Sequence, residues 1–159
     1  MKSEKRGIVV FDVEGVVMPK KRYLFFELGR NLGFSEFLRI IFYGFFYELG
    51  LISLKSALTR IFKSLKGIPV DELEQIFGSV PLIPGVNEIF EALKKDSWKT
   101  ALISSGLPTI IVQDLAFRLQ ADYAFGFELG EKEGILTGEI WGDVLEHRGK
   151  LPVLTRILE

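Results

Sequence analysis

The chain has 159 residues, 48% of them hydrophobic, a formal net charge of −1 and no cysteine. This length suits one domain with a substantial core, and the composition is typical of a globular protein rather than a disordered one. The lack of cysteine excludes disulfides, thiolate metal sites and cysteine nucleophiles and fits a reducing cytoplasm, while the near-balanced charge argues against nucleic-acid binding.

The first predicted element is a strand over residues 7–12, with the sequence GIVVFD. It is short, rich in β-branched residues and bounded by Gly7 and Gly15, which is typical of a fully buried strand. The residues before it, MKSEKRG, lack the apolar stretch and cleavage site of a signal peptide.

From about residue 20 to residue 78 the apolar residues follow a helical period, which predicts four helices. Gly33 is expected to end the first helix, and Ser35 to cap the second. Ser53 is expected to cap the third helix, and Pro69 to precede the fourth.

The most apolar part of this helical segment is residues 40–52, IIFYGFFYELGLI. Only eight uncharged residues separate Arg39 from Glu48, whereas a membrane-spanning helix needs roughly 20, so no membrane span is predicted. The aromatic residues here are expected in the core of the segment or at an interface, with a substrate-lining role as the alternative. They are Tyr43, Phe45, Phe46 and Tyr47.

The rest of the chain alternates helices and strands. VNEIFEALKKD predicts a helix with one apolar face formed by Val86, Ile89, Phe90 and Leu93, and WKTALIS predicts a buried strand at residues 98–104. A helix starting near Pro108, a strand DYAFGFEL, a turn, a short strand ILTGEI and a last helix follow. This order predicts an α/β, Rossmann-like parallel sheet.

Polar residues with catalytic potential follow the first two strands or begin the last helix. They are Asp12, Glu14, Ser104, Ser105, Gly106 and Lys150. Ligands of open α/β sheets bind at the carboxyl ends of the strands, so we expect these residues to meet there. A nucleophilic carboxylate, a second acid, a hydroxyl with a glycine-flanked turn and a lysine suit phosphoryl transfer, which depends on positioning and charge neutralisation.

Three segments carry a resemblance to a known family. VVFDVEGVV, KTALISSGLP and RGKLPVL resemble the first three motifs of the haloacid dehalogenase superfamily, and they occur in the order that the family has. The helical segment is similar to the small cap of the phosphoserine-phosphatase-like branch. The resemblance therefore implies a core at residues 1–17 and 83–159 and a helical cap at residues 18–82.

The resemblance also implies a role for each candidate residue. Asp12 would attack phosphorus to form an aspartyl-phosphate, and Glu14 would act as general acid and base. Ser104, Ser105, Gly106 and Lys150 would bind the phosphate of a small phosphorylated metabolite. Mg²⁺ would be held by the Asp12 carboxylate and the main-chain carbonyl of Glu14.

The sequence departs from the family pattern in two places. Glu14 stands where the family usually has Asp, which moves the carboxyl group by about 1.5 Å. The family's fourth motif, a strand that ends in acidic residues beside strand one, has no counterpart, since only LPVLTRILE follows Lys150 and its one acid is Glu159. Strand one is then expected to be an open edge, completed by further sequence, by a second copy or by another chain.

Two alternatives to a phosphatase therefore stay open. One is a catalytically incomplete module that associates through its open sheet edge and its apolar helical segment. The other is a phosphoacceptor that retains its aspartyl-phosphate because water is poorly activated. His147, the only histidine, is expected in a solvated loop, and a multi-histidine metal site is excluded.

Overall fold

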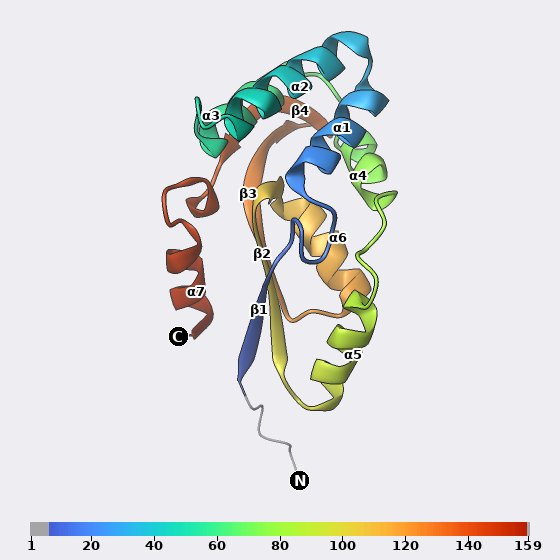
Figure 1. Cartoon of the computed structure of the whole chain (residues 1–159), viewed down its shortest axis with the longest axis vertical. Coiled ribbons are helices and arrows are strands. Elements are labelled where there is room, and N and C mark those ends of the chain that lie inside the picture. Colours follow the sequence, from blue (N-terminus) through green and yellow to red (C-terminus); the bar gives the residue numbers. More distant parts are fainter. Residues whose placement is uncertain (1–6, 159) are drawn as a thin grey trace.

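A computed structural model describes residues 7–158 and shows a twisted four-stranded sheet with helices around it (Figure 1). Its strands are β1 (Ile8–Asp12), β2 (Lys99–Pro108), β3 (Tyr123–Lys132) and β4 (Ile135–Trp141), in the order β1-β2-β3-β4. The pairs β1–β2 and β2–β3 are parallel, and β4 is antiparallel to β3. The predicted α/β fold is confirmed, with a mixed sheet in place of a wholly parallel one.

The antiparallel pair follows from a tight turn that the sequence placed correctly between β3 and β4. Glu133 and Gly134 connect the two strands with φ angles of 54° and 77°. Positive φ at both central residues matches the right-handed twist of a hairpin, so the chain reverses here without a crossover.

The four predicted helices between β1 and the rest of the sheet are present. They are α1 (Lys21–Leu32), α2 (Phe34–Glu48), α3 (Leu54–Ser64) and α4 (Val70–Gly78). Gly33 follows α1, and the Ser53 hydroxyl caps α3 by accepting the Ser56 N–H. The prediction for Ser35 is wrong, because α2 already begins at Phe34 and the Ser35 hydroxyl donates to the Glu36 carboxylate at 2.5 Å.

The remaining helices flank the sheet on both sides (Figure 1). They are α5 (Val86–Lys95), α6 (Thr109–Leu119), the short 3₁₀ helix η1 (Asp143–Leu145) and α7 (Lys150–Leu158). On α5, Val86 and Phe90 are buried as predicted, but Ile89 is half exposed, so the apolar face is narrower than expected. Helices α5 and α6 lie on one side of the strands and α7 on the other.

Strand β1 is less buried than its apolar composition predicted, and within residues 7–158 it is an edge strand, as the missing fourth motif predicted. Val10 is exposed and the other residues of β1 are not fully buried, because among the described residues β1 pairs only with β2. The register sets Asp12 opposite Ile103, so the end of β1 lies beside the residue that follows, Ser104. Glu159, the one acid after Lys150, lies outside the described residues.

The buried apolar side chains form one cluster that runs from the sheet into the helical segment. It includes Val13, Val17 and Met18 in the turn after β1, all of which are fully buried. This turn therefore packs between the sheet and the helices. Within residues 7–158 the structure contains no helix of the length and apolarity that crossing a membrane requires.

Candidate active site

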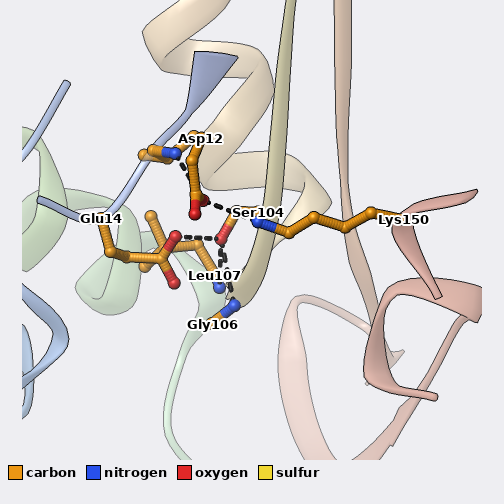
Figure 2. Close-up of polar contacts among 7 residues, drawn as sticks. Asp12, Glu14, Ser104, Gly106, Leu107 and Lys150 are labelled. Carbon is orange, nitrogen blue, oxygen red and sulfur yellow. Dashed lines mark hydrogen bonds and ion pairs between the residues drawn. The ribbon is translucent and has the colours of Figure 1, made fainter. Parts of the chain in front are cut away.

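The turn after β1 orients two carboxylates toward the same region. The Val13 carbonyl accepts the amides of Val16, Val17 and Met18, at 3.3, 2.8 and 2.9 Å, and the Val13 side chain is fully buried. Because Val13 faces the core, its neighbours Asp12 and Glu14 are left to face the other way, as the alternation of an extended segment predicts. Figure 2 shows both carboxyl groups directed toward Ser104.

Ser104 lies at the centre of the polar contacts in Figure 2. Its side chain is fully buried, and its hydroxyl donates to Glu14 Oε2 at 2.9 Å. The same oxygen accepts the N–H groups of Gly106 and Leu107, at 3.1 and 2.8 Å. The hydroxyl therefore links the end of β2 to the turn after β1 and holds the longer Glu14 side chain in one position.

Lys150 reaches this region from the opposite side, at the first residue of α7. Its Nζ lies 2.8 Å from Asp12 Oδ1, and both side chains are partly exposed to solvent. Asp12 Oδ1 also accepts a hydrogen bond from the Val13 N–H, at 2.9 Å. The ion pair joins residues 138 positions apart in sequence, and it places a cation where a dianionic phosphate beside Asp12 would need one.

The end of β2 is shaped by a glycine that the sequence analysis did not single out. A Cβ on Gly126 of β3 would lie 2.5 Å from the Leu107 carbonyl oxygen and 2.7 Å from the Thr109 nitrogen. Only glycine lets the backbone after Ser104 approach β3 this closely. A glycine inside the strand pattern DYAFGFEL is the signal that was available for finding it.

An open cavity of about 710 Å³ adjoins Ser105 and Lys150. Its charged and polar lining includes Lys55 from α3 and Glu146, His147 and Arg148 from the segment between η1 and α7. Lys55 and Glu146 form an ion pair that bridges the helical segment and the sheet-bearing part of the chain. We call this space the charged cavity. His147 is exposed, as expected for a loop residue.

The structure thus brings together most of the residues that the sequence proposed. Asp12 contacts Lys150, Glu14 contacts Ser104, and the Gly106 N–H joins the second pair through the Ser104 hydroxyl; Figure 2 shows the two groups of contacts next to each other. Ser105 stands apart from these contacts and lines the charged cavity. Lys55 and Arg148 were missed, because only the folded chain brings them to the cavity beside Ser105 and Lys150. Leu107 was missed because it contributes its backbone N–H, which the identity of an apolar side chain does not indicate.

This arrangement has the groups that phosphoryl transfer requires. Asp12 is a solvent-accessible carboxylate beside a lysine, and Glu14 is a second acid two residues further along the chain. A single carboxylate together with substrate oxygens and water is a donor set that Mg²⁺ accepts, although the described residues contain no cluster of three acidic, histidine or cysteine side chains.

Comparison with known proteins identifies relatives along nearly the whole chain. The family model described as haloacid dehalogenase-like hydrolase matches residues 9–159. A phosphoserine phosphatase of Archaeoglobus fulgidus is 31% identical over 98% of this chain and 44% of its own length, and one from Haemophilus influenzae is 28% identical over 99% and 49%. The chain spans about half the length of these curated relatives.

Solved structures give the same grouping. A hydrolase from Salmonella enterica serovar Typhi superposes with a TM-score of 0.83 and 28% identity, over 95% of this chain and 50% of that one. A phosphoserine phosphatase solved as a phospho-aspartyl intermediate analogue superposes with a TM-score of 0.79 and 25% identity, over 98% and 71%.

Proposed function

The chain belongs to the haloacid dehalogenase-like hydrolases, and from this premise we propose that it is a Mg²⁺-dependent phosphomonoester hydrolase that acts through Asp12. The observation that carries the proposal is the meeting of Asp12, Glu14, Ser104 and Lys150 at the carboxyl ends of β1 and β2. This is the edge at which α/β sheets bind their ligands, and the residues come from three separate parts of the sequence.

In the proposed reaction an oxygen of Asp12 attacks phosphorus, and the bond from phosphorus to the leaving oxygen breaks. Glu14 supplies a proton to that leaving oxygen, which departs as an alcohol. Asp12 is then an aspartyl-phosphate, and the deprotonated Glu14 takes a proton from the water that hydrolyses it. Asp12 is regenerated and inorganic phosphate is released.

The other residues position these groups and offset charge. Lys150 offsets the negative charge of the phosphate as the new bond forms, and Ser104 keeps the Glu14 carboxylate in place through its hydrogen bond. A Mg²⁺ ion held by the Asp12 carboxylate and the Glu14 main-chain carbonyl would add Lewis-acid charge neutralisation when bound. The helical segment, residues 18–82, would serve as the cap and residues 1–17 and 83–159 as the core.

The test is release of phosphate from an aryl phosphate such as p-nitrophenyl phosphate, with and without Mg²⁺. We expect chelation with EDTA to suppress the rate, and Asp12→Asn to lower it by a factor on the order of 10⁴ or more, since the nucleophile is lost. Asp96→Asn is the matched control, because Asp96 is an exposed acid at the end of α5. An Asp12→Asn rate equal to that of the unaltered protein would overturn the proposal.

The same preparation separates the two alternative functions. A phosphoryl adduct that survives acid and is cleaved by hydroxylamine, with little phosphate released, would indicate a phosphoacceptor instead of a hydrolase. No adduct and no release, together with a stable dimer in sedimentation, would indicate an association module.

A further inference from the structure

A second cavity, of about 650 Å³, lies between α1 and α2 and has an almost wholly apolar lining. Tyr23 and Phe26 of α1 face Phe37, Ile41 and Phe45 of α2 across it. We call it the apolar cavity. Its volume is in the range of small-molecule sites, which are typically apolar with a few polar groups at defined positions.

The two polar residues of the apolar cavity lie at the same end. Helices α1 and α2 run antiparallel, since Gly29 packs on Phe37 while Gly44 packs on Phe25. Lys20, just before α1, and Glu48, the last residue of α2, therefore both line the end of the cavity where α1 begins. The cavity is polar at that end and apolar along the rest of its length.

This polar end adjoins the turn after β1 that carries Glu14. The Cγ of Lys20 would lie 3.3 Å from a Cβ on Gly15, which directly follows Glu14. Figure 1 shows α1 rising from the turn after β1, with α2 packed across it. The leaving oxygen of a bound phosphomonoester must lie near the acid that protonates it, and Lys20 packs beside the residue that follows this acid in the chain.

We propose that the apolar cavity binds the leaving group of the substrate, and that this chain hydrolyses amphiphilic phosphomonoesters whose alcohol is a long alkyl or aryl group. The phosphate would lie beside Asp12 and Lys150, next to the polar end of the apolar cavity, where the charges of Lys20 and Glu48 offset each other. The apolar part would extend between Phe26, Phe37 and Phe45, where burial of each methylene is favourable. This inference rests on the proposed phosphatase function.

The experiment compares ethyl, butyl, hexyl and octyl phosphate as substrates below their micelle concentrations. We expect kcat/KM to rise two- to fourfold per methylene, a gain on the order of a hundredfold or more from ethyl to octyl, because each buried CH₂ contributes to binding. A flat dependence on chain length in the unaltered protein would overturn the inference.

A matched pair of variants tests the location. Phe45 lines the apolar cavity and is 55% exposed, whereas Phe42, on the same helix, is 54% exposed and does not line it. Phe45→Ser is expected to lower kcat/KM for octyl phosphate at least tenfold and so to flatten the chain-length dependence. Tyr23→Ser, in the facing wall, is expected to weaken the dependence in the same direction. Phe42→Ser is expected to retain it. Equal effects of Phe42→Ser and Phe45→Ser would instead indicate adsorption to the whole exposed face of α2 and would overturn the inference.

Binding of octylphosphonate, which cannot be hydrolysed, separates this inference from the function on which it rests. Isothermal titration is expected to show octylphosphonate binding far more tightly than ethylphosphonate, with the difference reduced by Phe45→Ser. If no phosphomonoester is hydrolysed but this difference remains, the phosphatase proposal fails and the ligand class of the cavity stands. Equal affinities of the two phosphonates would overturn the ligand class itself.

Discussion

The apolar cavity and the charged cavity have similar volumes, about 650 and 710 Å³, but they differ in the number of charged side chains that line them. The first lies between two helices of one hairpin and presents aromatic rings. The second lies where α3 meets the η1–α7 segment and presents Lys55, Arg148 and Lys150. The apolar cavity lies beside the turn after β1 and Lys150 lines the charged cavity, so a substrate at the proposed site would meet apolar surface on one side and positive charge on the other.

If the proposed function holds, the two sides of the site would have separate roles. Positive charge beside Lys150 would act on the phosphate, which every phosphomonoester has, and so would affect all substrates alike. Apolar surface would act on the alcohol, which differs between substrates, and so would determine selectivity. The following predictions test whether the two sides act separately.

Among the variants that test this comparison, Lys150→Ala is expected to have the largest effect. Removing a cation that neutralises the phosphate should lower kcat/KM by roughly 10²–10³, as for loss of one preorganised donor. Because Lys150 contacts Asp12 and not the apolar cavity, the loss should be the same for ethyl and octyl phosphate. Steady-state kinetics on both substrates measure this, and a loss confined to octyl phosphate would contradict the division.

Gly126→Ala is expected to disturb the site through packing. The new methyl group would meet the Leu107 carbonyl oxygen and the Thr109 nitrogen, and the segment after Ser104 would have to shift. We expect a loss of about 1–3 kcal/mol in the free energy of unfolding, together with a fall in kcat for every substrate. Urea unfolding measures the change in the free energy of unfolding. Gly78→Ala is the control, because nothing lies within 4 Å of its added methyl group.

Ser104→Ala tests the hydrogen-bonding centre of the site. The N–H groups of Gly106 and Leu107 would lose their acceptor, which should lower the free energy of unfolding by about 1–3 kcal/mol. Glu14 would also lose a partner, so kcat should fall more than substrate affinity. Ser105→Ala, which removes the neighbouring hydroxyl, is the comparison for urea unfolding and kinetics. An equal loss of stability in both variants would show that the hydrogen bonds of Ser104 do not account for the loss.

The ion pair across the charged cavity is expected to contribute little to stability. Lys55 and Glu146 are both more than half exposed, so a double-mutant cycle with Lys55→Ala and Glu146→Ala should give a coupling energy of about 0.2–1 kcal/mol. The measurement is urea unfolding at low and high salt, with the coupling reduced at high salt. A coupling that persists unchanged at high salt would show a desolvated pair.

The smallest effect is expected at the opposite end of the sheet, which serves as a reference. The Tyr123 hydroxyl accepts a hydrogen bond from Lys99 Nζ at 3.1 Å and raises the pKa of Lys99 above its usual value of 10.5. A raised pKa stabilises the fold at pH values below 10.5 and loses that effect as pH rises further. Tyr123→Phe should therefore lower the melting temperature slightly at pH 8, by an amount that shrinks toward pH 11, and leave kcat/KM at pH 8 unchanged.

Much of the fold could be predicted from local patterns in the sequence. The predicted end of α1 at Gly33 and the predicted start of α3 after Ser53 were correct, because cap preferences depend on only a few neighbouring residues. The burial predicted for β1 from its apolar composition was wrong, whereas the open edge predicted from the missing fourth motif agrees with the strand order among the described residues. Ile89 was wrong because α5 buries only part of its apolar face. The prediction that Ser35 caps α2 was wrong, because its hydroxyl donates a hydrogen bond to the neighbouring Glu36 carboxylate instead.

For the candidate site, too, the sequence predicted local features and left the contacts between distant residues open. By itself the sequence determined which chemical groups the protein possesses and the order in which they follow the strands, because strand, turn and helix signals are local. Only the tertiary structure decided that Lys150 lies against Asp12, that Ser104 holds Glu14, and that α1 and α2 enclose an apolar cavity beside Gly15. These contacts join residues far apart in the chain, and their geometry is set by how the elements pack together.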